Sequence, residues 1–111
     1  MKNSVLYTAA ARRDLEEIRD YIAEELSNPD AAGHTVNAIL NAAERLEQFA
    51  LLGAPLASVT GVKSEYRFLV SGSYLVFYRI KGQNVFIDRI LYGKRNYLKV
   101  LFQEFQTETE E

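Results

Sequence analysis

An uninterrupted apolar and aromatic run in the second half of the chain most constrains the fold. Residues 73–80 read SYLVFYRI, the turn KGQN follows, and residues 85–92 read VFIDRILY. A strand that is apolar on both faces belongs inside a sheet whose two sides are both covered. The sequence therefore predicts a β-hairpin around Gly82, with residues 73–80 as the central strand.

Two amphipathic helices are predicted before this hairpin. Thr8 can cap the first helix, which extends to about Leu26, and Asn28 with Pro29 suits the start of the second. The short link between them predicts an antiparallel helical hairpin. The expected apolar stripes are Ala11, Leu15, Ile18, Ile22 and Leu26 in the first helix, and Ala32, Val36, Ile39, Ala43, Leu46 and Phe49 in the second.

The remaining segments complete the predicted order. We expect a short strand at residues 5–7, a loop at 52–64 marked by glycine and proline, and a strand at 64–70. In the last strand, alternation places Arg89 on one face with Ile87 and Leu91. Asn96 can cap a final helix that reaches Phe105, and the acidic tail within residues 103–111 should fray.

This order, β-α-α-β-β-β-α, predicts a single α+β domain over residues 1–111. Its antiparallel sheet should carry the N-terminal helical hairpin on one face. The length of 111 residues and a hydrophobic content of 48% suit one globular domain. No apolar run is long enough for a transmembrane helix, and the absence of cysteine excludes disulfides and is compatible with a reducing compartment.

Charge is unevenly distributed along this chain of net charge -2. Residues 1–60 hold five basic and nine acidic side chains, residues 61–102 hold eight basic and two acidic, and residues 103–111 hold four glutamates. A local positive field can attract an anionic partner even when the whole protein is acidic. The basic segment is therefore either the candidate functional surface or a solvated face.

Familiar catalytic and metal-binding motifs are missing from the sequence. His34 is the single histidine, a residue that in such isolation is usually structural, and neither HExxH nor CxxC spacing occurs. There is no phosphate-binding glycine loop and no GxSxG nucleophile motif. We therefore expect no metal and no cofactor.

The candidate site residues are cations and a tyrosine near the end of the basic segment. Arginine can contact phosphate through two donors, and the start of the last helix could bind an anion. Arg89 is equally compatible with a structural ion pair, whereas Tyr74 and Tyr78 are expected in the core. The candidate binding residues are Arg67, Arg79, Arg89, Lys94, Arg95 and Tyr97.

Several stretches resemble the RelE/ParE superfamily of type II toxin–antitoxin toxins. YRFLVSGSYLVFYRIKGQNVFIDRILYGKRNYLKVLF is similar to its C-terminal half, and YTAAARRDLEEIRDYI with the Asn28-Pro29 pair is similar to its N-terminal half. The resemblance covers residues 5–102. It implies a compact bacterial toxin that acts in the cytoplasm, inhibits growth and stabilises plasmids. A cognate antitoxin encoded beside it would neutralise it by laying an extended segment and a helix over the toxin.

The resemblance leaves the target open between two branches. In the RelE type, which cuts mRNA on the ribosome, Arg95 matches a catalytic arginine and Arg67 a strand cation, and Tyr97 lies near the C-terminal tyrosine. Leu69 and Leu75 stand where that type carries further cations. The stretches SGSYLVFYRI and DRILYGKRNY are more similar to the ParE branch, which inhibits DNA gyrase without a nuclease site. We therefore expect a gyrase-directed binding toxin rather than an enzyme. The alternatives are an mRNA endoribonuclease, with Arg95, Arg67 and Tyr97 as catalytic candidates, or an inactive member.

Overall fold

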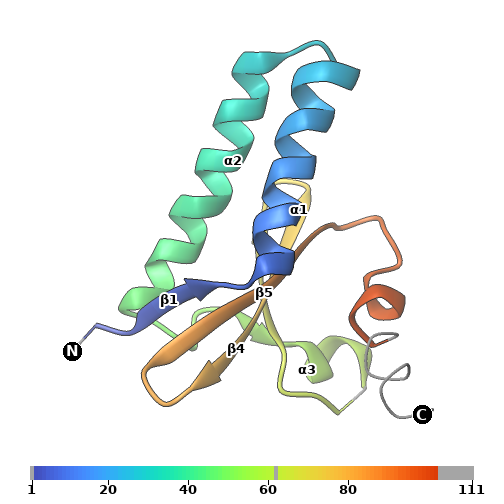
Figure 1. The fold of residues 1–111 in the computed structure, drawn as a ribbon. Coiled ribbons are helices and arrows are strands. Elements are labelled where there is room, and N and C mark those ends of the chain that lie inside the picture. The colour runs from blue at the N-terminus through green and yellow to red at the C-terminus, as the bar shows by residue number, and fades with distance from the viewer. Residues whose placement is uncertain (1, 62, 103–111) are drawn as a thin grey trace.

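The computed structural model describes residues 2–61 and 63–102. A five-stranded sheet forms one layer and a helical hairpin the next (Figure 1). The strands are β1 (Ser4–Tyr7), β2 (Ala54–Pro55), β3 (Arg67–Ser71), β4 (Tyr74–Lys81) and β5 (Asn84–Tyr92). The helices are α1 (Ala9–Asp20), the π-helical turn η1 (Tyr21–Glu25), α2 (Pro29–Glu44), the 3-10 turn η2 (Arg45–Glu47) and α3 (Leu56–Thr60).

The strand order is β1-β5-β4-β3-β2, so β4 is central as the apolar run predicts. The expected antiparallel sheet is present from β5 to β2. β1 differs from that expectation, because it pairs with β5 in parallel and makes the sheet mixed. The direction of β1 follows from the crossover through the helical hairpin, which returns the chain to the opposite edge of the sheet.

Both hairpin helices begin at the predicted caps. The Thr8 hydroxyl accepts a hydrogen bond from the Ala11 amide at 3.1 Å and donates one to the Asp88 carbonyl at 3.0 Å. The Asn28 side chain accepts from the Ala31 amide at 3.1 Å. Thr8 therefore both starts α1 and ties it to β5. The prediction for Phe49 was wrong: α2 ends at Glu44, and Phe49 is 60% exposed in the following loop.

The core has two parts, one on each face of the sheet. On the helix-covered face, Val76, Tyr78 and Ile87 pack against Ile18 and Ile39. On the opposite face, a smaller cluster is built from Leu56, Tyr66, Phe77, Leu91 and Leu101. A final helix, residues 97–102, contributes to this second cluster. The central strand is therefore covered on both faces. Phe105 and the acidic tail lie outside the described residues.

The segment predicted as a loop at residues 52–64 contains β2 and α3. Pro55 immediately precedes α3, and Gly61 ends it with a φ of 74°. The sequence prediction treated the proline and glycine as marks of irregular structure. Here they are the boundaries of a five-residue helix: Pro55 is its N-cap, and Gly61 is its C-cap in the left-handed conformation that favours glycine.

Strict alternation along β5 was also a wrong prediction. Tyr78 pairs with Ile87, and the preceding Phe77 pairs with Arg89, so Asp88 is an extra residue in the strand. This β-bulge shifts the alternation by one residue. As a result Ile90, rather than Leu91, joins Ile87 in the helix-facing core.

Candidate functional site

The chain turns sharply where β5 gives way to the last helix. The Gly93 amide donates to the Ser73 carbonyl at 2.8 Å, and the Arg95 amide donates to the Tyr92 carbonyl at 3.0 Å. The Asn96 side chain accepts from the Lys99 amide at 3.4 Å, as expected of a helix cap. These contacts hold the corner in place and leave Lys94 and Arg95 exposed.

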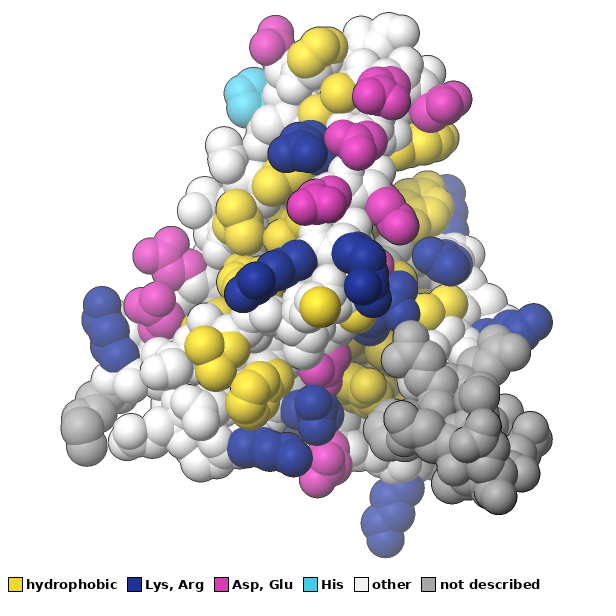
Figure 2. Space-filling model, viewed as in Figure 1, with side chains coloured by type: hydrophobic (Ala, Val, Ile, Leu, Met, Phe, Trp, Pro, Cys, Tyr) yellow, Lys and Arg dark blue, Asp and Glu magenta, His cyan; other side chains and the backbone are white. Residues whose placement is uncertain are grey.

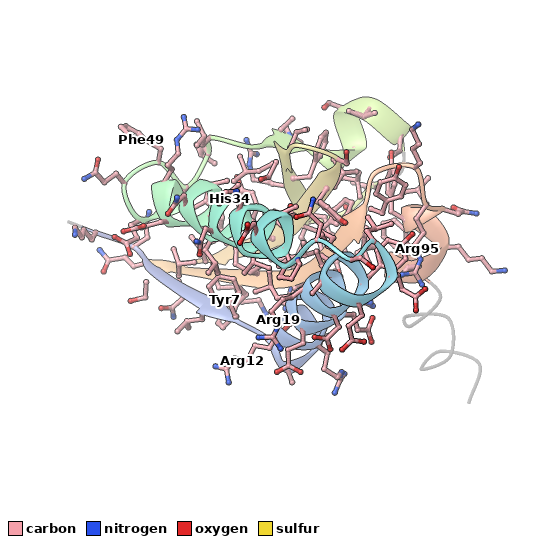
Figure 3. All side chains as sticks on the ribbon, turned by 90° about the horizontal axis from the view of Figure 1, so that it is seen from above. Tyr7, Arg12, Arg19, His34, Phe49 and Arg95 are labelled. Carbon is pink, nitrogen blue, oxygen red and sulfur yellow. The ribbon has the colours of Figure 1, made fainter. Side chains whose placement is uncertain are left out.

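Arg95 is one of the residues that line a cleft in the described structure. The cleft has a volume of about 670 Å³ and opens between the tip of the helical hairpin and the turn that joins β3 to β4. Figure 3 shows Arg95 at one end of the molecule and Phe49 at the opposite end. The residues that line the cleft are Asp14, Glu17, Ile18, Tyr21, Ile22, Leu26, Ala31, Thr35, Ser73, Tyr74, Ile90, Leu91, Tyr92 and Arg95.

Three tyrosines, Tyr21, Tyr74 and Tyr92, line the cleft. Tyr74 and Tyr92 meet edge to face with ring centroids 5.8 Å apart. Burial, followed by the nearby phenols of Tyr92 and Tyr21, raises the pKa of Tyr74. Tyr21 is 54% exposed and Leu26 is 57% exposed, so the apolar wall on the hairpin is available to a partner. An apolar groove with a few polar groups beside it is the kind of surface that binds an amphipathic helix.

Arg89 does not present its charge to solvent. Its guanidinium donates to the Asp14 carboxylate at 2.8 and 3.0 Å, and its side chain is only 17% exposed. The structural ion pair left open by the sequence is therefore present. Asp14 itself is buried on α1.

Arg79 and Arg67 are also engaged within the fold. Arg79 donates through two nitrogens to the Asp88 carboxylate, and this hydrogen bond raises the pKa of Arg79. Arg67 donates to the Gly53 carbonyl at 2.6 Å and to the Leu51 carbonyl at 3.2 Å. Both guanidinium groups thus stabilise neighbouring strands and loops.

The predicted candidates therefore separate into two groups. Arg67, Arg79 and Arg89 make structural contacts, whereas Lys94 and Arg95 are exposed at the corner. Tyr97 packs against Phe77 with ring centroids 5.4 Å apart, so its ring helps to anchor the start of the last helix to the sheet.

Charged side chains are unevenly distributed over the face of the molecule that Figure 2 shows. Figure 2 shows acidic side chains mainly along the upper helical hairpin, and Lys and Arg side chains mainly across the middle and lower part. His34 is exposed on α2. Within residues 2–61 and 63–102, no group of three His, Cys, Asp or Glu side chains could hold a metal ion. None of the helices described there has the length and apolar character to cross a membrane.

The sequence did not identify the hairpin wall of the cleft. Tyr21 and Leu26 looked like ordinary members of a helical surface or stripe, and the π-helical turn around them carries no local sequence signal. Their joint exposure beside Tyr74 and Tyr92 is a property of the packed structure. The one available signal was a large apolar residue on either side of the acidic pair Glu24 and Glu25, in residues 21–26.

Two kinds of comparison identify relatives of this chain. The sequence family described as "ParE toxin of type II toxin-antitoxin system, parDE" matches residues 5–97. A structure of the chromosomal ParDE toxin–antitoxin system from P. aeruginosa is similar, with 28% identity and a TM-score of 0.69. The alignment covers 82% of this chain and 96% of that one.

A second structure shares the fold at lower identity. It is the toxin–antitoxin complex RelBE2 from Mycobacterium tuberculosis, with 23% identity and a TM-score of 0.59 over 83% of this chain and 92% of that one. No curated protein matches. The family match covers most of the sequence, the fold agrees with it, and the chain belongs to the ParE family of type II toxin–antitoxin toxins.

Proposed function

We propose that this toxin inhibits growth by binding DNA gyrase and that it acts in the cytoplasm. We favour gyrase over mRNA as the target because the arginines on the strands form hydrogen bonds and ion pairs within the fold. Arg67 is bonded to backbone carbonyls, and Arg79 and Arg89 are paired with carboxylates. RNA cleavage requires groups that activate the 2′-hydroxyl, stabilise the phosphorane and protonate the leaving oxygen. Three arginines that already hold groups of the fold are poorly placed to perform these catalytic steps.

The residues between these arginines support the same choice. Leu69 packs with the helix-facing core, and Leu75 packs with the opposite cluster. Neither side chain can donate a proton or stabilise a charge. Inhibition through binding needs only a complementary surface, which the cleft and the exposed corner beside it provide.

We further propose that the cognate antitoxin neutralises the toxin by covering the cleft. A partner helix with an apolar face would fill the space between Tyr21 and Tyr74. An acidic side chain on that helix would meet Arg95 at the rim. Because Arg95 belongs to both the cleft and the exposed corner, an antitoxin bound there would compete with the target for one surface.

An mRNA endoribonuclease is the second candidate. The observation that favours it is Arg95, exposed directly after the last strand with Tyr97 two residues further on. Arg95 could stabilise a phosphorane, although the corner offers no evident general base.

Purified toxin distinguishes the two candidates. A gyrase-directed toxin should inhibit supercoiling by purified gyrase and leave mRNA on translating ribosomes intact. Ribosome-dependent cleavage without an effect on gyrase would reverse the choice. In a parallel growth assay, induction of the toxin alone should arrest a bacterial culture, and coexpression of a neighbouring reading frame should restore growth. Normal growth at confirmed expression would identify an inactive member of the family.

A further inference from the structure

A second, smaller cavity lies beside the end of the last helix, residues 97–102. It has a volume of about 310 Å³ and shares no lining residue with the cleft that contains Arg95. Two aromatic rings form its apolar wall, since Tyr66 and Phe102 meet edge to face with ring centroids 6.0 Å apart. We call this cavity the aromatic pocket, and the residues that line it are Lys63, Ser64, Glu65, Tyr66, Arg79 and Phe102.

The charged groups of the aromatic pocket differ in how they are engaged. Arg79 is bound through two nitrogens to the carboxylate of Asp88. Lys63 is exposed, and among residues 2–61 and 63–102 it forms no ion pair, even with Glu65 in the same wall. The aromatic pocket therefore combines an apolar interior with an exposed cation. It suits an aromatic ring that has a carboxylate close by.

The chain that continues from the aromatic pocket has this composition. Phe102 is the last residue that the structure describes, and residues 103–111 read QEFQTETEE. Phe105 is the one apolar residue among these nine, and its spacing of three from Phe102 is that of side chains on one helix face. The segment also has four glutamates, and Glu104 directly precedes Phe105. An aromatic ring flanked by negative charge thus begins three residues from a matching pocket.

The short connection favours this segment over a free ligand. A group tethered a few residues from its site has an effective concentration there on the order of millimolar. The start of the tether is fixed, because Leu101 is buried in one cluster with Phe77 and Leu91 of the sheet. Figure 1 shows the last helix on the same side of the sheet as α3, which contributes Leu56 to that cluster.

We propose that Phe105 occupies the aromatic pocket and that the acidic tail, held in this way, competes with anionic partners for the exposed corner. The glutamates of the tail would face Lys63 beside the pocket. They would also lie near the corner, because the last helix is only about 9 Å long. Charges at that distance interact at physiological salt, so the tail lowers the positive field at Lys94 and Arg95.

This competition would be a form of autoinhibition built into the chain. Residues 61–102 hold eight basic and two acidic side chains, and the four glutamates of the tail offset most of that excess. An anionic partner would have to displace the tail before it reached Arg95. The effect on toxicity rests on the proposed function, whereas the docking of Phe105 does not.

The absence of tryptophan from the chain makes the docking directly measurable. Phe105→Trp places a single indole at the proposed contact, and Gln106→Trp places one at the next position as the matched control. We expect acrylamide to quench the fluorescence of Phe105→Trp several-fold less than that of Gln106→Trp. Adding Lys63→Glu to Phe105→Trp should increase the quenching, whereas adding Lys81→Glu, at the exposed end of β4, should not.

Binding to heparin, a polyanion, measures the competition. Phe105→Ala leaves the net charge unchanged but releases the tail, so at low salt it should bind a heparin column more tightly than the unaltered protein. Gln106→Ala should elute with the unaltered protein. Thermal unfolding confirms that each variant is folded.

The outcomes separate the parts of the proposal. Equal quenching of the two indoles would overturn the docking of Phe105. Equal behaviour of Phe105→Ala and the unaltered protein on heparin, including no retention of either, would overturn the competition. Protection of the Phe105→Trp indole that disappears on dilution would assign the ring to the pocket of a second copy, against the proposal. Neither readout involves gyrase, so an absence of gyrase inhibition would refute the proposed target alone.

Discussion

Asp14 of α1 holds Arg89 of β5 through two hydrogen bonds, at 2.8 and 3.0 Å. The same carboxylate accepts the Ile90 amide at 2.9 Å. β1 pairs with β5 only as far as Ile87, so no strand covers the following part of this edge in the described structure. Asp14 thus takes the place of a strand there and joins the helical layer to the sheet.

Loss of this carboxylate should strongly destabilise the fold. We predict that Asp14→Ala lowers the free energy of unfolding by about 3–5 kcal/mol, because it leaves Arg89 and the Ile90 amide without their shared acceptor. The matched control is Asp20→Ala, which removes an exposed pair with Arg19 and should cost at most about 1 kcal/mol. Urea unfolding measures both variants, and equal losses would contradict the structural role of Asp14.

Two glycines should respond in opposite directions to alanine. At Gly53, a Cβ would lie 2.4 Å from the Phe68 carbonyl oxygen and 2.7 Å from the Tyr78 hydroxyl, whereas at Gly33 nothing lies within 4 Å. We predict that Gly53→Ala destabilises the fold by at least about 1–3 kcal/mol. Gly33→Ala, inside α2, should stabilise it by about 0.5–1 kcal/mol. Equal midpoints for both variants in thermal unfolding would refute the close packing at Gly53.

Alkaline pH should weaken the fold through Tyr7. Burial, followed by the negative charge of Glu44, raises the pKa of Tyr7 above its ordinary value of 10.0. The folded state therefore holds the phenolic proton more tightly than the unfolded state does. The resulting stability is fully present below about pH 10 and is lost as the pH rises further.

The variant Tyr7→Phe isolates this contribution. Its unfolding free energy should fall less steeply than that of the unaltered protein between about pH 10 and 12. Tyr21→Phe, at an exposed position, is the control for loss of a phenol. Urea titrations at a series of pH values measure the slopes, and an unchanged slope for Tyr7→Phe would rule out its part in alkaline unfolding.

Arg95 should matter for toxicity and little for stability. We predict that Arg95→Ala reduces growth arrest much more than Arg12→Ala and changes the unfolding free energy by about 0.5 kcal/mol or less. The reason is position: Arg95 lies at the rim of the cleft, whereas Arg12 points outward from α1 (Figure 3). Growth is compared at equal expression, and equal toxicity of the two variants would remove Arg95 from the site.

The kind of defect in Arg95→Ala reports the chemistry of the target. If Arg95 meets a nucleic-acid phosphate, binding should weaken and its dependence on salt should become shallower by about one unit of slope. If Arg95 stabilises a cleavage transition state, the rate should fall by about 100-fold or more.

The sequence by itself determined the helical hairpin, the long strands and the layers that they form, but it missed β2 and α3 in the segment predicted as a loop. Thr8, Asn28 and Asn96 cap helices as predicted, because capping depends on residues only a few positions apart. The apolar run at residues 73–80 became the central strand for an equally local reason. Both of its faces are apolar, so both must be buried against other parts of the chain. The resemblance to known toxins likewise depended on the order of residues along the chain.

Only the tertiary structure decided what the charged and aromatic side chains do. Asp14 and Arg89 lie 75 positions apart, and no local pattern marks them as partners. The bulge at Asp88 shifted the faces of β5 because the register depends on how β4 and β5 pack. Tyr21 became a wall of the cleft through its position opposite Tyr74. Side-chain roles of this kind depend on distance and burial, which packing sets after the helices and strands have been specified.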